Sequence, residues 1–337
     1  MGRLGKWFVV GVIAVAALLA VAITFTVGWR PFIGPKARPL TSRTFERTPQ
    51  RLERGRYIVT ALSGCLYCHS PHQWTAPGHP IVAGMEGAGE ELPYGDLPGR
   101  IIAPNLTSDR TTGAGNWSDD QLARAIREGI GHDGRALFPI MPYGHYREMS
   151  DEDVAAVVVY FRSLPALRHE LPKTEIIFPV KYLIRGIPEP ITSPVANEDA
   201  PDPARRGAQL VNLAGCIDCH TPQIKGENLP GLDFAGGAVF SGPWPTVASA
   251  NITPDPTGIP YYDEALFLEV MRTGSVHARQ LSAVMPVSVY KNLTDADLKA
   301  IFAYLRTLKP VKHRVDNSMP PTECKVCKQK HGAGASN

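Results

Sequence analysis

The longest apolar stretch of the chain runs from Trp7 to Val27 and contains no charged residue. It is long enough for the about 20 residues that a helix needs to cross a hydrocarbon layer of about 30 Å. Arg3 and Lys6 precede it, and positively charged flanks stay on the cytoplasmic side of a membrane. We therefore expect residues 1–30 to form a single-pass anchor in a bacterial inner membrane, with a cytoplasmic N-terminus and a periplasmic remainder.

A cleaved signal peptide is the alternative interpretation of this stretch. Ala20-Val21-Ala22 offers the small residues of a cleavage site. The apolar run is longer than the about 7–15 residues of a usual signal core, which favours a retained anchor. In either case the bulk of the chain is expected on the far side of the membrane.

Beyond the anchor, two stretches show the apolar period of an amphipathic helix, at i, i+3, i+4 and i+7. These positions are Val154, Val157, Val158 and Phe161 in the first stretch, and Leu298, Ile301, Phe302 and Leu305 in the second. Ser150 and Thr294 are the expected N-caps of the two helices. A third helix is expected after Ser118, with Gln121 completing a capping box.

The two helices close two copies of one repeated unit. Arg54–Pro71 aligns without gaps with Arg205–Pro222, and an Asn-x-Thr and a Met-Pro landmark follow in the same order in both copies. The landmarks are Asn105–Thr107 and Met141-Pro142 in the first copy, and Asn251–Thr253 and Met285-Pro286 in the second. A repeat of this kind predicts two domains of the same fold. We expect an all-α protein with domains at residues 44–165 and 204–312, joined by a Pro-rich linker at 166–203.

Composition changes this picture little. The 337 residues suffice for two domains, and 44% hydrophobic with 20% charged residues is a globular balance. A formal charge of +3, with no basic stripe interleaved with aromatic residues, argues against nucleic acid as a partner. The 31 glycines and 31 prolines predict small helices separated by long irregular loops.

Each copy carries the spacing Cys-x-x-Cys-His, which is the spacing of c-type haem attachment. Two thiols three residues apart can each form a thioether with a haem vinyl group, and the adjacent imidazole can bind the iron. The alternative, a redox or structural cysteine pair followed by a chance histidine, would have to occur twice in matched places. We therefore predict two covalent haem c groups per chain. Their residues are Cys65, Cys68 and His69 in the first copy, and Cys216, Cys219 and His220 in the second.

The second axial ligand of each iron is predicted to be a methionine. Met141 and Met285 hold the same place between the haem motif and the closing helix of their copies. A lone methionine is more often a core residue, but the repeat favours ligation here. Methionine with histidine raises the reduction potential of haem iron. The rival ligands are His132 and His277, which also match across the repeat.

A third cysteine pair, Cys324 and Cys327, is followed by Lys328 instead of histidine. In an oxidising compartment such a pair can form a disulfide or stay as two thiols. A lysine-ligated third haem is a further alternative. A zinc site with His331 would lack further obvious ligands. We expect residues 313–337 to be a flexible basic tail.

The order of motifs resembles the cytochrome c subunits of membrane-bound alcohol, aldehyde and gluconate dehydrogenases. The residues that carry this resemblance are GCLYCH from Gly64, IIAPNLT from Ile101, the stretch from Asn116 to Tyr143, and SDEDVAAVVVYFRSLP from Ser150. The resemblance implies class I-like cytochrome c folds with His69/Met141 and His220/Met285 as axial pairs. It also implies a dehydrogenase as electron donor and a quinone-linked or oxidase acceptor. The chain differs from three-haem members by lacking a third Cys-x-x-Cys-His.

Three classes of function follow from these motifs. The leading one is an electron-transfer protein or oxidoreductase subunit without a substrate site of its own, because an iron with six ligands cannot bind a small molecule. A di-haem enzyme of the peroxidase or thiosulfate-oxidising type would need an open iron. A haem-bearing anchor subunit of a larger respiratory complex would co-purify with stoichiometric partners.

Overall fold

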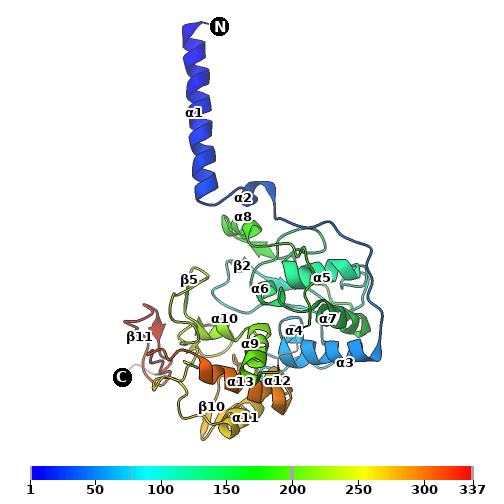
Figure 1. The fold of residues 1–337 in the computed structure, drawn as a ribbon, viewed down its shortest axis with the longest axis vertical. Coiled ribbons are helices and arrows are strands. Elements are labelled where there is room, and N and C mark those ends of the chain that lie inside the picture. The colour runs from blue at the N-terminus through cyan, green and yellow to red at the C-terminus, as the bar shows by residue number, and fades with distance from the viewer. Residues whose placement is uncertain (1, 77, 198–200, 335–337) are drawn as a thin grey trace.

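The computed structural model describes residues 2–76, 78–197 and 201–334 (Figure 1). Helix α1 (Arg3–Phe25) stands apart from the rest of the molecule and buries none of its residues. Within the described ranges it is the one helix long and apolar enough to cross a membrane, with a mean hydropathy of 2.8. The expected N-terminal apolar helix is therefore present.

The first repeat unit is mainly helical, and the short strands β1 (Glu90–Glu91), β2 (Gly99–Arg100) and β3 (Ile102–Ala103) lie in its long loops. Its helices are α3 (Pro49–Tyr57), the π-helical segment η1 (Ile58–Leu62), α4 (Cys65–Cys68), α5 (Asp119–Glu128), α6 (Tyr143–Tyr146) and α7 (Asp151–Ser163). Antiparallel pairs join β1 to β3, and β2 to β4 (Glu175–Ile176), which lies in the linker.

The second unit repeats this order of helices. They are α9 (Pro203–Leu213), α10 (Cys216–His220), α11 (Glu264–Thr273), α12 (Val287–Tyr290) and α13 (Asp295–Thr307). Its antiparallel pairs are β5 (Gln223–Ile224) with β6 (Glu227–Asn228), β7 (Val239–Phe240) with β8 (Val247–Ala248), and β9 (Ser275–Val276) with β10 (Arg279–Gln280). Every named strand is two residues long, so the expectation of an all-α fold holds only in part.

The helix starts agree with the sequence prediction. Ser150 and Thr294 cap α7 and α13 by accepting hydrogen bonds from the backbone N–H groups three residues on, at 3.0 and 3.1 Å. Ser118 and Gln121 form the expected capping box at α5. Each cap satisfies a backbone donor that the first turn of a helix leaves unpaired.

A glycine lies where the first helix of each unit crosses the closing helix. Gly55 of α3 packs on the Ala156 carbonyl of α7, and Gly207 of α9 packs on the Ala300 carbonyl of α13. A Cβ atom at either glycine would collide with that carbonyl. The two crossings are equivalent, and they require a residue without a side chain.

The crossing glycines correct the ungapped alignment of the two units by one residue. Gly55 precedes Cys65 by ten positions, whereas Gly207 precedes Cys216 by nine. The extra residue is accommodated in η1, where the Ser63 N–H donates to the carbonyl of the residue five positions earlier at 2.8 Å. In the stretch before the haem motif, Gly55 therefore corresponds to Gly207, and not to Arg206 as in the ungapped alignment.

Each unit has a hydrophobic core, and the two cores meet. Ile58 and Leu122 belong to the first core, and Phe267 belongs to the second. Ala61 and Leu62 of η1 are part of the second core although they belong to the first unit. The two units therefore pack against each other through apolar side chains.

The segment between α1 and α3 is extended but held against the first unit. Arg38 bonds the buried carboxylates of Asp120 and Glu128 at 2.7 and 2.8 Å. The backbone N–H of Thr41 donates to Asp120 at 2.7 Å. Short helix α2 (Arg30–Ile33) contacts α8 (Val180–Leu183) and the 3-10 turn η2 (Ile184–Gly186) of the linker near the base of α1 (Figure 1).

The C-terminal segment has more structure than the sequence predicted. Strands β11 (Thr322–Glu323) and β12 (Lys330–His331) form a hairpin whose turn contains Cys324 and Cys327. His313, Cys327 and His331 are buried. The segment expected to be a flexible tail is thus folded as far as residue 334.

Candidate haem sites

The two haem motifs begin at glycines in the left-handed backbone region. Gly64 has φ 58° and precedes α4, and Gly215 has φ 66° and precedes α10. A residue with a side chain is strained in this conformation, whereas glycine is not. The short helix that follows each glycine carries both cysteines of the motif, so the two thiols of a pair lie on one turn.

The histidine of each motif is oriented by a backbone carbonyl. His69 Nδ1 lies 2.8 Å from the Pro104 carbonyl oxygen, and His220 Nδ1 lies 2.7 Å from that of Ala250. A carbonyl can only accept, so Nδ1 carries the proton and Nε2 presents its lone pair. Burial lowers the pKa of both imidazoles, which keeps them neutral. Both are therefore in the tautomer that a metal requires of histidine.

The two candidate methionines lie in the same kind of turn. The Met141 N–H donates to the Phe138 carbonyl at 3.1 Å, and the Met141 carbonyl accepts from Tyr143 at 2.8 Å. The corresponding bonds of Met285, with Ser282 and Val287, are 3.0 and 2.7 Å long. Met141 packs on the first core and Met285 on the second. The equivalence seen in the sequence therefore extends to the backbone geometry.

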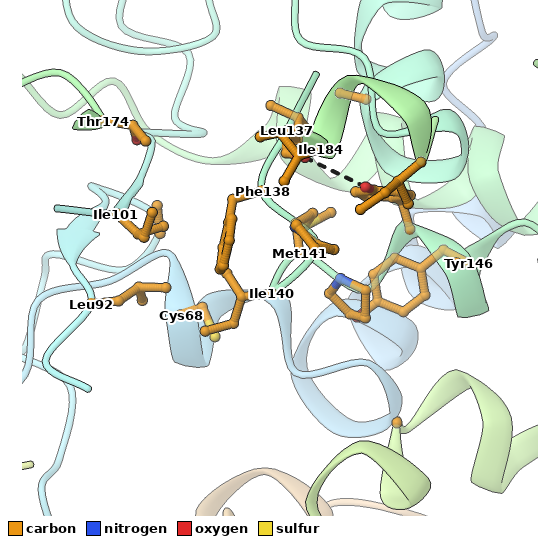
Figure 2. Close-up of a pocket in the computed structure, with 18 of the residues that line it drawn as sticks. Cys68, Leu92, Ile101, Leu137, Phe138, Ile140, Met141, Tyr146, Thr174 and Ile184 are labelled. Atoms are coloured by element: carbon orange, nitrogen blue, oxygen red, sulfur yellow. Dashed lines mark hydrogen bonds between the residues drawn. The ribbon is translucent and has the colours of Figure 1, made fainter. Parts of the chain in front are cut away.

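A cavity of about 1660 Å³ opens between the motif and the methionine of the first unit. It exceeds the about 300–1,000 Å³ of a pocket for one drug-sized ligand. Cys65, Cys68, His69 and Met141 line it together. Figure 2 shows Cys68 and Met141 around this cavity, with apolar side chains such as Phe138 beside them. Two thiols, an imidazole and a thioether around one large apolar space are a donor set that fits a covalent haem.

The thiols of the two motifs are held in the neutral form. Burial raises the pKa of Cys65, Cys216 and Cys219 to about 12, and that of Cys68 to about 11. Cys219 is exposed and lines the large cavity. All four cysteines are unpaired, so each retains the S–H group that addition to a vinyl group needs.

The second unit contributes to the wall of the first cavity. Cys219 and Tyr290 line it together with residues of the first unit. Met285 and Cys216 pack on the core of the second unit. The two candidate sites therefore adjoin each other across the interface between the units.

A matched pair of tyrosines, which was not predicted, ties each methionine turn to its haem motif. Tyr146 in α6 donates to the Ser63 carbonyl at 3.1 Å, and Tyr290 in α12 donates to the Ala214 carbonyl at 2.7 Å. Each acceptor lies two residues before the first cysteine. Both tyrosines are five residues after a candidate methionine, so the repeat itself held the signal.

His145 bridges the two units at the second haem motif. Its Nδ1 lies 2.7 Å from Asn212 Oδ1, and its Nε2 lies 2.8 Å from Asp218 Oδ1, between the two cysteines of that motif. Asn212 uses its Nδ2 to donate to Glu148 at 2.8 Å, which fixes its oxygen toward His145. Both ring nitrogens thus face acceptors, and the hydrogen bond to Asp218 raises the pKa of His145.

The structure places the rival ligands at the surface. His132 and His277 are both exposed, and the His132 ring stacks on Trp117 at 4.3 Å between ring centroids. His132 nevertheless lines the large cavity together with Met141, so the choice of methionine there rests on its packing against the first core.

Two other pairs that match across the repeat have structural roles. Asn105 and Asn251 are buried, and each accepts from both the backbone and the hydroxyl of the threonine two residues on. Arg127 bonds the Met149 carbonyl at 2.8 Å and Arg272 bonds that of Lys291, at the start of each closing helix. These side chains therefore hold the loops and the starts of the closing helices in place.

Comparison with known proteins finds that the chain is similar to cytochromes c. Residues 204–309 match the cytochrome c family model. A component of the nicotinate dehydrogenase of Pseudomonas putida is 32% identical over 90% of this chain and 25% of its own length. The cytochrome c subunit of the quinone alcohol dehydrogenase of Gluconobacter oxydans is 29% identical over 77% of this chain and 55% of its own length. A diheme cytochrome c-type protein of Cereibacter sphaeroides is 26% identical over 77% of this chain and 86% of its own length.

Cytochrome subunits of fructose and gluconate dehydrogenases match as well. The chain spans a quarter of the nicotinate dehydrogenase component and between half and three fifths of the alcohol, fructose and gluconate dehydrogenase subunits. The resemblance to dehydrogenase cytochrome subunits that the motifs indicated is thereby confirmed.

Proposed function

We propose that this chain, a homologue of dehydrogenase cytochrome c subunits, relays electrons through two covalently bound haems. The observation that carries this proposal is the occurrence of one donor set twice. Each unit pairs a Cys-x-x-Cys-His helix, whose imidazole is held by a carbonyl, with a methionine in an equivalent turn. The haem supplies reversible one-electron exchange at iron, and the chain supplies the ligands and the apolar surroundings.

The residues that would hold each haem follow from this donor set. Cys65 and Cys68 would form the thioethers of the first haem, with His69 and Met141 on its iron. In the second unit Cys216 and Cys219 would form the thioethers, and His220 and Met285 would be the axial ligands. A histidine–methionine pair saturates the iron, which suits electron transfer and leaves no position for a substrate.

The two candidate haem sites lie next to each other, which supports electron exchange between the haems inside the chain. Cys219 lines the cavity that also contains Cys65, Cys68 and Met141. The attachment helix of the second haem thus forms part of the wall of the first site. An electron delivered to one haem would pass to the other without leaving the protein.

We further propose that α1 anchors the chain in a bacterial inner membrane, with the haem units on the periplasmic side. Figure 1 shows α2 and α8 of the linker close to the base of α1. Exposed apolar side chains lie on α2 and on the linker. They are Phe32, Ile33, Ile177, Phe178, Leu183 and Ile187. Arg30, Lys181 and Arg185 lie among them in the sequence. Apolar side chains with Lys and Arg are typical of a surface that rests on lipid head groups. The donor would be a periplasmic dehydrogenase, and the acceptor a quinone-linked or oxidase partner.

The first experiment is a pyridine haemochrome assay on quantified full-length protein, with spectra of the oxidised and reduced forms. Two haems per chain, both low-spin, with the near-infrared band of methionine-ligated iron, are expected. A high-spin component in the untreated protein would instead indicate an open iron and a di-haem enzyme. A single haem, or a third one at the last cysteine pair, would contradict the proposed donor sets.

Isolation from native membranes in mild detergent tests the partner. A dehydrogenase that co-purifies in stoichiometric amount, and whose substrate reduces both haems, is the expected result. A chain that purifies alone and is not reduced by any membrane dehydrogenase activity would contradict the proposed donor.

A further inference from the structure

The C-terminal hairpin brings four metal-binding side chains together. The ligand atoms of His313, Cys324, Cys327 and His331 all lie within 4.8 Å of one another. His313 Nε2 is 3.3 Å from Cys324 Sγ, and His331 Nε2 is 3.0 Å from Cys327 Sγ. Two sulfurs and two imidazole nitrogens around one point are a donor set of structural zinc sites.

The spacing of these atoms fits one ion. Zinc takes sulfur at about 2.3 Å and nitrogen at about 2.0–2.1 Å in a tetrahedron, which separates neighbouring ligand atoms by about 3.3–3.8 Å. Both of the separations above join a sulfur to a nitrogen, for which the tetrahedron gives about 3.5 Å, and they are within about half an ångström of that value. The widest separation in the cluster, up to 4.8 Å, would shorten on binding. A cluster of two metals would need a wider arrangement.

The side chains are also oriented as ligands. His313 Nδ1 lies 3.0 Å from the Ala235 carbonyl oxygen, so its Nε2 presents the lone pair toward the sulfurs. The Val326 N–H lies 3.4 Å from Cys324 Sγ, where it would stabilise a thiolate. His313 is 1% exposed and Cys327 is 0% exposed. This is a buried cluster and not a chance meeting of surface groups.

The first unit provides an internal comparison. His169 is the counterpart of His313, because its Nδ1 lies 3.0 Å from the Ala88 carbonyl and its N–H, like that of His313, bonds a threonine hydroxyl. No cysteine pair follows His169 in the first unit. The imidazole thus belongs to the repeated fold, and the second unit adds two thiols and a second histidine to it.

A glycine makes room for the added residues. Gly237 follows Gly236, whose counterpart in the first unit is Gly89, so Gly237 occupies the place of Glu90. A Cβ at Gly237 would lie 2.7 Å from His313 Cε1 and 2.8 Å from His331 Nε2. The backbone can therefore approach both imidazoles only because this position has no side chain.

We propose that His313, Cys324, Cys327 and His331 bind one zinc ion, which fastens the C-terminal hairpin to the second haem unit. Binding replaces the two thiol protons by the metal, releases them to solvent and transfers no electron. Zn²⁺ with two thiolates and two neutral imidazoles has no net charge, so the buried site needs no counter-ion.

The fastened hairpin covers the surface beside the second haem motif. Asn317 exchanges two hydrogen bonds with Ala248 of β8, at 2.9 and 2.8 Å. Gln329 donates to the carbonyl of Gln223, a residue of the large cavity wall, at 2.5 Å. Zinc would lock these contacts, because metal-binding energy adds to folding energy where the site exists only in the folded state.

The test measures zinc against haem in full-length protein purified without chelator. Elemental analysis should find about one zinc for every two haems, and zinc-edge X-ray absorption should show two sulfur and two nitrogen neighbours. Cys327→Ser and His313→Ala should lose at least nine tenths of the zinc while both haems remain. His169→Ala, which removes the matched imidazole of the first unit, should keep the zinc.

Three results would overturn the proposal. One is protein with intact haems and no zinc, even after reduction and incubation with one equivalent of zinc chloride. Another is a Cys324–Cys327 disulfide found by peptide mass spectrometry in the protein as isolated. The last is haem attached to this pair. Haem content reports folding independently of zinc, so a misfolded variant is recognised by its loss of haem. Lys325→Ser, which changes the hairpin turn but no proposed ligand, is a second matched control and should keep both zinc and haem.

Discussion

The proposed chemistry depends most on the methionine that would be the second axial ligand of each haem iron. Met285 is followed by proline, lies in the same turn as Met141, and packs on the core of its unit. Another methionine, Met149, is fully buried in the first core at the place that Leu293 occupies in the second unit. The repeat therefore separates a ligand candidate, present in both units, from a core methionine, present in one.

Met285→Ala should open the second iron and leave its haem covalently attached, because the thioethers are made by Cys216 and Cys219. We expect the low-spin spectrum of that haem to become high-spin, with about half of the near-infrared methionine band lost. Absorption spectra with haem quantification check this result. Met149→Leu and His277→Ala should leave the spectrum unchanged, and an unchanged low-spin spectrum for Met285→Ala would refute the assignment.

At the scale of elements, the two units show how one fold absorbs an extra residue. Gly55 and Gly207 must meet the closing helices, and Cys65 and Cys216 must begin the attachment helices. With both ends fixed, the additional residue of the first unit enters as the π-helical turn η1. A single turn inside an α-helix is the usual form in which π-helix occurs.

Deleting Thr60 should therefore be tolerated. The deletion gives the first unit the spacing of the second, so Gly55 and Cys65 can keep their places on a regular α-helix. Deleting Ala208 from α9 instead leaves the second unit one residue short, and Gly207 then loses its register with Ala300. We expect full haem content for the first variant and loss of the second haem for the other, measured by haemochrome assay. Loss of the first haem on deleting Thr60 would show that η1 is required.

Local signals predicted the helices well, whereas long-range contacts could not be predicted from the sequence. The caps at Ser118, Ser150 and Thr294 follow from hydrogen bonds within three residues, which a sequence shows directly. The ligand set around Cys324 was missed because its fourth member, His313, lies eleven residues before the pair and meets it only through the hairpin fold. The one-residue offset was missed because glycine crossings are visible only in three dimensions.

For the whole molecule, the contact between the units matters most. His145 of the first unit bonds Asp218 inside the second haem motif, and both of its ring nitrogens face acceptors. A neutral imidazole has one N–H and could serve only one of them. The interface is therefore complete when His145 is protonated. No local pattern could predict this contact, because the two partners are 73 residues apart.

The stability of the interface should depend on pH in a defined direction. The pKa of His145 is raised in the folded chain above its unfolded value of about 6.5. The contribution of His145 to the free energy of unfolding is thus fully present below about pH 6.5. It is lost as the pH rises through the pKa of His145 in the folded chain. The difference in thermal midpoint between the native chain and His145→Gln should be larger at about pH 6 than at about pH 9.

His132→Gln is the matched control, because this imidazole stacks on Trp117 and not on a carboxylate. Its effect on the thermal midpoint isolates the loss of an imidazole that has no carboxylate partner. A difference for His145→Gln that stays constant or grows with pH would contradict the assignment of a protonated imidazole.

The extended segment after α1 has a consequence for how such a protein meets its partners. Arg38 binds two buried carboxylates and α2 contacts the linker, so the segment between the apolar helix and the first unit is held at two places. In an anchored chain the first unit would face the lipid at a constant height, and the second would point outward (Figure 1). A membrane-bound acceptor would then reach the haem of the first unit by lateral diffusion alone. A donor that approaches from the side away from the membrane would meet the haem of the second unit. Electrons would therefore travel toward the membrane along the axis of the molecule.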